Sequence, residues 1–294
     1  MKIVFIGTVD FSRLALERLV RMKAEIVGIC TQQGSTFNAD FFDLSNIGKA
    51  NGIPCHYSSD INSPETLGWI KEKSPDIIFC FGWSKLLKRD LLNIAPMGVV
   101  GFHPAALPEN RGRHPLIWSL VLGLDKSAST FIFMDEGADS GDILSQCDIT
   151  IEDTDDARSL YDKVAETALV QIEEFVPRLA AGNMPRRKQD PQGANTWRKR
   201  GEADGQIDWR MSARSIHNLV RGLAKPYVGA HFVAGAQKIT VWKSEIVTGV
   251  ERYIEPGKVI ASDPDGTPVI RCGEDAIRLL IIEPLFEPPV GSYL

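Results

Sequence analysis

The first half of the chain alternates short, wholly apolar runs with longer stretches that are apolar on one side only. Runs without polar alternation are typical of strands buried on both faces of a parallel sheet. The stretches between them repeat apolar residues every three to four positions, as amphipathic helices do. The predicted strands are residues 2–7, 25–30 and 76–81, and the predicted helices are residues 12–22, 43–51 and 64–73. This order predicts an α/β fold with a Rossmann-like, mostly parallel sheet and helices on both faces.

The turn after the first predicted strand lacks the sequence that binds dinucleotides. It reads Gly7-Thr8-Val9-Asp10, without the G-x-G-x-x-G spacing that lets a backbone approach a pyrophosphate. The second predicted strand is followed by Thr31 and Gln32, so no acidic side chain is available for a ribose hydroxyl. An NAD-dependent dehydrogenase is therefore disfavoured.

The second half of the chain predicts a separate, smaller domain. A long amphipathic helix over residues 155–181 is followed by a polar stretch rich in Pro, Gln and Arg. We therefore predict a catalytic domain over residues 1–183, a linker over 184–204 and a second domain over 205–294. After a helix at 212–222, short apolar segments separated by turns are typical of a small, OB-like β-barrel. The predicted strands are residues 229–233, 238–243, 257–261, 267–272 and 277–283.

Composition narrows the class of protein. The 294 residues are 44% hydrophobic and carry a formal net charge of −5, which is unfavourable for broad electrostatic binding of nucleic acid. The 5 cysteines form no C-x-x-C pair, so no zinc site or disulfide framework is predicted, and Cys30 and Cys80 are expected in the core. The chain starts with a strand-like run instead of a signal peptide, and no apolar run approaches the ~20 residues of a membrane span. A cytoplasmic enzyme that contacts no membrane is the expectation.

A histidine and an aspartate each follow an apolar run in the middle of the chain. His103 comes after residues 97–100, and Asp139 stands in a glycine-rich turn after residues 130–134. Open α/β sheets bind ligands at the carboxyl ends of their strands, so the two residues can meet at one site. An imidazole accepts a proton near neutral pH, and a carboxylate fixes its tautomer and stabilises the imidazolium. The pair predicts general-base catalysis, with a strand-capping histidine and a turn-forming aspartate as the alternatives.

The sequence around this pair resembles the signature of the folate-dependent formyltransferases, H-P-x-x-L-P-x-x-R-G followed by D-x-G-x-I. The matching residues are His103, Pro104, Leu107, Pro108, Arg111, Gly112, Asp139, Gly141 and Ile143. The resemblance implies transfer of a formyl group from 10-formyltetrahydrofolate to an amine, with His103 as general base oriented by Asp139. No metal is expected, because His103 and His114 share no helix face and have no third ligand nearby.

Gly101 is the main departure from that family. The resemblance implies an asparagine two residues before the histidine, where its amide donates a hydrogen bond to the oxyanion, and this chain has glycine there. Removal of one such donor typically costs about 10²- to 10³-fold in rate. A backbone N–H near Gly101 replaces the amide, or another side chain does, or the chain is slow or inactive. Ile132 is a second, less central departure, because many relatives carry a histidine there.

The resemblance also implies the contacts of both substrates. Residues 79–87 match the strand and loop that hold the pterin in this family. A flat heterocycle of this kind needs an apolar slot with exposed backbone donors and acceptors. The alternative is that these residues are an ordinary core strand and turn. The implied folate contacts are Phe81, Gly82, Trp83, Lys85, Leu86, Leu87, Leu107, Pro108, Ala138 and Asp139. The implied acceptor contacts are Thr8, Asp10, Phe11, Pro104, Arg111, Gly112, Arg113 and Tyr227.

Two classes of acceptor remain to be separated. In the tRNA-formylating relatives a basic insertion follows the second strand, whereas residues 34–43 here contain no Lys or Arg and two Asp. The P-Y-x-G-A segment at 226–230 looks more like the sugar enzymes. Basic residues in 186–188 and 198–200 favour tRNA, although a solvated linker explains them equally.

We therefore expect an N-formyltransferase that acts on a nucleotide-linked amino sugar in polysaccharide biosynthesis and binds no nucleic acid. Formyl transfer to tRNA or to another amine is the first alternative, and a catalytically degenerate binding protein is the second. The apolar run at 281–290 would serve a homodimer interface, with a core strand as the simpler interpretation.

Overall fold

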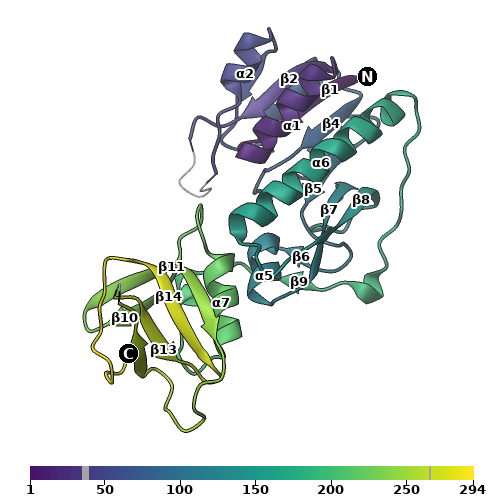
Figure 1. Ribbon diagram of the computed structural model, residues 1–294. Coiled ribbons are helices and arrows are strands. Elements are labelled where there is room, and N and C mark those ends of the chain that lie inside the picture. Colours follow the sequence, from purple (N-terminus) through teal and green to yellow (C-terminus); the bar gives the residue numbers. More distant parts are fainter. Residues whose placement is uncertain (35–39, 265) are drawn as a thin grey trace. The chain divides into compact units, whose positions relative to one another are not determined.

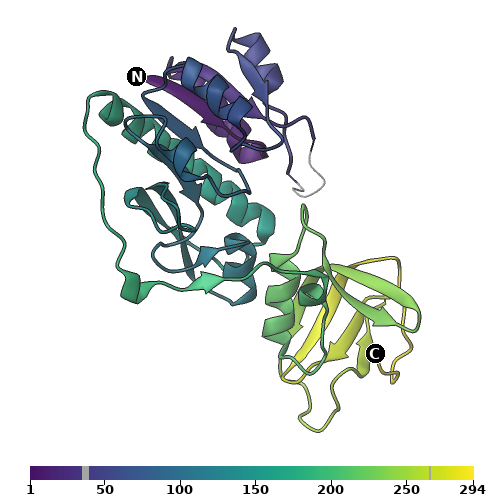
Figure 2. The same ribbon diagram turned by 180° about the vertical axis from the view of Figure 1, so that it is seen from behind.

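The computed structural model describes residues 1–34, 40–264 and 266–294, which form two compact units (Figure 1, Figure 2). Each unit is assembled from three stretches of the chain. The first unit comprises Met1–Pro115, Ser127–Ile149 and Asp162–Trp197, and the second comprises Leu116–Lys126, Thr150–Tyr161 and Arg198–Leu294. The linear domain boundaries inferred from the sequence stay a prediction.

A seven-stranded sheet in the order β3-β2-β1-β4-β5-β7-β8 forms the centre of the first unit. The strands from β3 to β5 in this order run parallel, and β7 pairs with β5 antiparallel. The bounds are β1 (Lys2–Ile6), β2 (Glu25–Thr31), β3 (Cys55–Tyr57), β4 (Ile77–Cys80), β5 (Val99–His103), β7 (Lys126–Phe133) and β8 (Ile143–Thr150). The predicted mostly parallel α/β sheet is confirmed.

Helices cover both faces of this sheet, which explains the apolar runs. Val4 of β1 belongs to a buried cluster with Ile70 of α3 on one face. Phe5 points to the other face, where its ring centroid lies 5.5 Å from that of Phe81, and Phe11 of α1 packs on Phe81 as well. Figure 1 shows α1 and α6 in front of the sheet, and Figure 2 shows the opposite face. The bounds are α1 (Asp10–Arg21), α2 (Ser45–Ala50), α3 (Pro64–Glu72), α4 (Arg89–Leu92) and α6 (Ala157–Ala180).

A short strand pair joins the polar stretch after α6 to the first unit. β6 (Arg111–Gly112) pairs in parallel with β9 (Thr196–Trp197). Neither strand was predicted, because two residues are too few to show a periodicity. The pairing brings the residues before the second unit next to the loop that follows β5.

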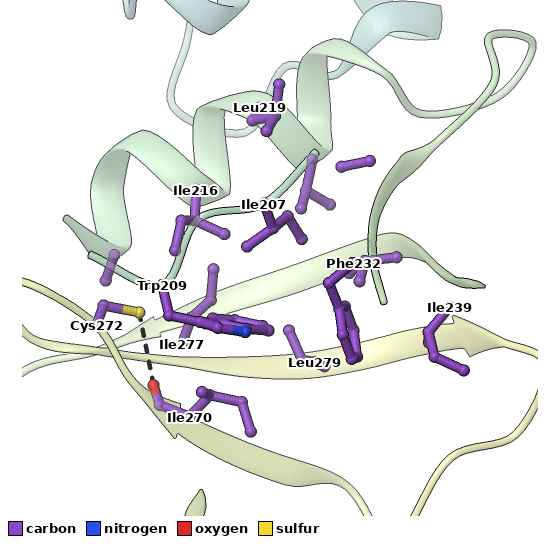
Figure 3. Close-up of a cluster of buried hydrophobic side chains, with 14 of the residues drawn as sticks. Ile207, Trp209, Ile216, Leu219, Phe232, Ile239, Ile270, Cys272, Ile277 and Leu279 are labelled. Carbon is purple, nitrogen blue, oxygen red and sulfur yellow. Dashed lines mark hydrogen bonds between the residues drawn. The ribbon is translucent and has the colours of Figure 1, made fainter. Parts of the chain in front are cut away.

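An antiparallel five-stranded sheet in the order β10-β11-β14-β13-β12 forms the second unit. α7 begins after Ser212, whose side chain accepts a hydrogen bond from the Ser215 amide, as a helix cap does. Figure 3 shows Ile216 of α7 above Trp209 in the core of this unit, to which Phe232 also belongs. The predicted small C-terminal β-domain is confirmed. The bounds are α5 (Pro115–Val121), α7 (Ala213–Gly222), β10 (Ala230–Ala234), β11 (Gln237–Val247), β12 (Val259–Ser262), β13 (Pro268–Arg271) and β14 (Ala276–Glu283).

The cysteines lie where the sequence places them. Cys30 and Cys80 are buried, and burial raises the pKa of Cys80 to about 12, so this thiol stays protonated near neutral pH. Across the described ranges, no helix combines the length and apolar character needed to cross a membrane.

Candidate active site

His103 is the last residue of β5, at the carboxyl end of a central strand. β7 pairs with β5 as far as His103, which lies opposite Thr130, whereas the pairing with β4 ends at Gly101. Only 6% of the His103 side chain is exposed. The ring is therefore fixed in place, and its contacts decide which nitrogen can exchange a proton.

Asp139 faces this ring from the turn between β7 and β8. Its Oδ1 lies 3.5 Å from His103 Nδ1, and its Oδ2 accepts a hydrogen bond of 2.9 Å from the Gly112 amide. The backbone of Asp139 has a φ of +55°, a left-handed conformation that is uncommon outside glycine. A carboxylate in this position favours a proton on Nδ1, which leaves Nε2 as the nitrogen for proton transfer.

A backbone carbonyl contacts that second nitrogen. His103 Nε2 lies 2.8 Å from the carbonyl oxygen of Asn110. Because a carbonyl only accepts hydrogen bonds, Nε2 carries the proton in this contact. The Asp139 and Asn110 contacts are both satisfied only when both ring nitrogens are protonated. To act as a base, Nε2 must therefore release this proton and leave the Asn110 carbonyl, whose place the acceptor amine then takes.

The space beside Gly101 is filled by Met134. A Cβ on Gly101 would lie 2.8 Å from Cγ and 2.9 Å from Sδ of Met134, so no asparagine fits unless Met134 moves. Gly101 is in register with Cys80 of β4 and with Ile132 of β7, so its peptide groups belong to the sheet. This favours a side chain over a backbone N–H of Gly101 as the oxyanion donor.

Comparison with known sequences identifies the family. Residues 1–174 match the formyl transferase family, and residues 200–288 match the formyl transferase C-terminal domain. The chain belongs to the formyl transferase family. It is 31% identical over 288 residues to the methionyl-tRNA formyltransferase of Caldanaerobacter subterraneus subsp. tengcongensis (strain DSM 15242 / JCM 11007 / NBRC 100824 / MB4), a match that covers 96% of this chain and 92% of the relative.

Two solved structures have the same fold as this chain. The N-formyltransferase from Helicobacter canadensis, in complex with folinic acid and dTDP-3-aminofucose, has a TM-score of 0.72 at 16% identity over 95% of this chain and 98% of its own. HypX from Aquifex aeolicus in complex with tetrahydrofolic acid has a TM-score of 0.66 at 15% identity over 96% of this chain, which spans only 44% of HypX. The resemblance inferred from the sequence is thus confirmed, and with it formyl transfer from a formyl-tetrahydrofolate as the reaction of the family.

The loop after β4 has groups that suit a flat heterocycle. The indole Nε1 of Trp83 is buried and has no hydrogen-bond partner in the described part of the chain. Leu86 is 62% exposed although it is apolar. Gly82 has a φ of +68°, and a Cβ there would lie 2.1 Å from a methyl of Val9, so only glycine allows this path of the backbone. An unpaired donor beside an exposed apolar side chain fits the pterin of the co-substrate.

The other implied folate contacts divide into core and surface. Phe81, Leu87 and Leu107 are buried, and the Lys85 ammonium donates a 2.8 Å hydrogen bond to the Ser59 carbonyl. Half-buried or exposed surface remains at Pro108 and Ala138. The folate contacts as a set stay a prediction.

The first turn, expected to meet the acceptor, is closed by bonds within the protein. Thr8 Oγ1 donates to the Gly82 carbonyl at 3.0 Å, and its own carbonyl accepts from the Phe42 amide at 2.8 Å. The Asp10 amide donates to the Asp40 carbonyl at 2.9 Å. Burial raises the pKa of the Asp40 carboxyl, and the nearby Asp10 adds to this effect. The Asp10 amide is already bonded, and the two carboxyl groups, of which that of Asp10 is paired with Arg13 at 2.7 Å, disfavour a phosphate there. Of the acidic insertion at 34–43, residues 35–39 lie outside the described part.

The remaining acceptor residues belong to several elements. Arg111 donates from Nε and Nη2 to Gln189 Oε1 at 3.1 and 2.7 Å, and the Arg113 amide donates to the Trp197 carbonyl. Tyr227 belongs to the second unit, whereas His103 belongs to the first. Phe11 is buried against Phe102, and Pro104 is half-buried directly after His103. These acceptor contacts stay predictions.

Three residues of the site were missed from the sequence: Asn110, Gln189 and Asn195. Asn110 stands at an unspecified position (x) inside the H-P-x-x-L-P-x-x-R-G motif. It contacts His103 through its backbone carbonyl, a group that every residue has. Gln189 and Asn195 lie in the polar stretch after α6. A sequence does not show whether an amide side chain is hydrogen-bonded within the protein or solvated, so Gln189 and Asn195 could not have been predicted. Only the position of Asn110 within the motif could have pointed to a residue of the site.

Proposed function

We propose that this formyltransferase transfers the formyl group of 10-formyltetrahydrofolate to the amine of a nucleotide-linked amino sugar. The observation that carries the chemistry is the contact between His103 and Asp139 at the carboxyl end of β5. A sugar acceptor is favoured over tRNA by the closed, acidic first turn and by the net charge of −5.

The proposed reaction uses the two ring nitrogens of His103 in different ways. The acceptor amine bonds to the formyl carbon, and the carbonyl electron pair moves to the oxygen. The ring reacts as the neutral tautomer with its proton on Nδ1: Nε2 has released its own proton to solvent and left the Asn110 carbonyl, and it takes the amine proton. Asp139 stabilises the resulting imidazolium through Nδ1. The bond from carbon to the folate nitrogen then breaks and that nitrogen takes the proton, which leaves a formamide and tetrahydrofolate.

The four arginines among the basic residues that would favour tRNA are bound within the protein. Arg186 lies 3.7 Å from the Phe133 ring, and Arg187 donates to Gln146 at 2.7 Å. Arg198 forms an ion pair with Asp204, and Arg200 lies over the Trp118 ring. Cations that already have partners are less available to phosphates. The methionyl-tRNA relative at 31% identity nevertheless keeps tRNA as the second candidate acceptor.

A mass-spectrometric assay tests the proposal. Purified protein is incubated with 10-formyltetrahydrofolate and a panel of dTDP-, UDP- and GDP-linked amino sugars, with methionyl-tRNA as a parallel acceptor. We expect a gain of one formyl mass on a sugar, and a rate lower by about 10²- to 10⁴-fold in His103→Ala and Asp139→Asn. The exposed Gln192→Ala variant is the control and should keep the wild-type rate. Formylation of the tRNA alone would assign the second acceptor, and no product while folate still binds would point to a protein without catalysis.

A further inference from the structure

The polar stretch between α6 and the second unit runs along the catalytic loops. We call residues 187–197 the crossing segment. The amides of Arg187 and Ile143 each donate to the carbonyl of the other, at 2.9 and 2.8 Å, which ties the start of the segment to β8. At its other end, β9 pairs with β6 directly after the Asn110 carbonyl. The segment thus spans from the Asp139 turn to the loop that contacts His103.

Gln189 joins these two loops through one side chain. Its Oε1 accepts both hydrogen bonds from Arg111, and its Nε2 donates to the Asp139 carbonyl at 2.9 Å and to the Gly141 carbonyl at 2.7 Å. An amide has one oxygen and two N–H groups, so every group of this side chain is used. The turn needs such support, because the left-handed backbone of Asp139 is strained.

Asn195 holds the peptide that contacts the base. Its Oδ1 accepts from the Asn110 amide at 2.6 Å, and its Nδ2 donates to the Asn110 side-chain oxygen at 3.2 Å. Its own carbonyl accepts from the Arg111 amide at 3.1 Å. Asn110 also has a left-handed φ, of +64°. Asn195 therefore determines where the carbonyl lies that contacts His103 Nε2.

We propose that Gln189 and Asn195 are positioning residues, which orient Asp139 and His103 for proton transfer without touching either substrate. The proposal rests on the proposed function for its kinetic consequence. It assigns these two side chains of the crossing segment to the catalytic step, so their removal should lower kcat and leave KM almost unchanged.

Substitutions within the segment test this kinetic consequence. Gln189→Glu keeps the acceptor for Arg111 but loses both donors, and Asn195→Asp keeps the acceptor for the Asn110 amide but loses its donor. We expect kcat to fall by about tenfold or more in Gln189→Ala and Asn195→Ala, with a smaller loss in Asn195→Asp. KM for both substrates should stay within about twofold, and Gln192→Ala should match the wild type. A raised KM at unchanged kcat would overturn the proposal in favour of substrate binding.

A spectroscopic measurement keeps the test independent of the acceptor. Long-range ¹H–¹⁵N spectra report the ring nitrogens of His103, whose signals are identified by their absence in His103→Ala. Asn195→Ala should shift these signals, whereas Gln192→Ala should not. Unchanged His103 signals in Asn195→Ala would contradict the proposal even in an active enzyme. If the wild type formylates no acceptor, the proposed function fails and this spectrum still decides the role of Asn195.

Discussion

Gly101 differs from the asparagine that the family resemblance implies in more than the loss of an amide. Met134 occupies the space above it, and a Cβ at residue 101 would come within 2.8 Å of that side chain. A glycine and a methionine together therefore occupy the place of the expected polar residue near His103. This site has an apolar surface where an oxyanion donor would be expected, so the donor must come from another position.

Replacing Gly101 with asparagine should show that Met134 excludes a side chain at position 101. We expect Gly101→Asn to lower the free energy of unfolding by about 1–3 kcal/mol, because an overpacked core must shift to admit it. Adding Met134→Ala should recover part of that loss, since it removes the atoms that collide. Thermal denaturation of both variants is the measurement. Gly68→Asn is the control, because a Cβ there meets nothing within 4 Å. Equal losses in the single and the double variant would contradict this account.

At the scale of elements, two contacts determine how segments are held. In the first unit, the pairing of β6 with β9 depends on Gly112, whose φ is +100° and whose missing Cβ would lie 2.3 Å from the Trp197 carbonyl oxygen. In the second unit, His217 of α7 lies 3.1 Å from the Ser244 hydroxyl of β11, at Nδ1, and joins the helix to the sheet. We expect the β6–β9 pairing to affect the rate of formyl transfer and the His217–Ser244 contact to affect the stability of the second unit.

Gly112→Ala should disturb both the strand pair and the site. A side chain at this φ is strained by about 1–3 kcal/mol, and the collision with Trp197 adds to this. The amide of residue 112 also holds Asp139, so the rate of formyl transfer should fall along with the melting temperature. Gly193→Ala in the same segment is the matched control, because its Cβ would meet only Pro108 at an ordinary 3.4 Å. An active, stable Gly112→Ala enzyme would refute the importance of this pairing.

α7 should make the second unit sensitive to acid. Burial lowers the pKa of His217 below its ordinary value of 6.5, and the cations of Arg221 and Arg214 lower it further. Below pH 6.5 the unfolded chain therefore binds the proton more readily than the folded chain, so stability falls as the pH falls. Urea unfolding from about pH 7.5 to about pH 5.5 should show a shallower decline in His217→Gln than in the wild type. Burial also lowers the pKa of His231, so stability should depend even less on pH in a variant that combines His217→Gln with His231→Gln. Parallel curves of unfolding free energy against pH for all three proteins would exclude this explanation.

For the whole molecule, charge and acceptor class are linked. A net charge of −5, with arginines of the polar stretch bound internally, leaves little to attract a polyanion. A nucleotide sugar needs only a few charged contacts for its diphosphate. The dependence of the reaction on salt therefore reports the acceptor class.

Formylation of the sugar should depend weakly on ionic strength. We expect kcat/KM to change by less than about tenfold between about 50 and 200 mM salt, whereas a tRNA enzyme with many phosphate contacts would lose about 10³-fold or more. Initial rates at both salt concentrations are the measurement, with the uncharged cosolvent sucrose as the control for solution effects. A steep loss with the sugar acceptor would mean that phosphate contacts dominate binding.

The sequence by itself determined the layers of the fold and the contact between His103 and Asp139. Neighbouring residues such as Val4 and Phe5 face opposite sides of one sheet. Because both sides are buried, the strand is a continuous apolar run that can be recognised in the sequence alone. His103 and Asp139 were found because the chemistry requires those two residue types at the ends of strands.

Only the tertiary structure decided how that pair is held. Asn195 contacts a residue 85 positions away, and Gln189 contacts one 78 positions away, through turns whose conformation the sequence does not reveal. The position of Met134 over Gly101 likewise depends on the register between β5 and β7. Burial of apolar side chains leaves a periodic pattern along the chain, whereas a polar contact between distant loops leaves none, because the same side chains are equally stable in water.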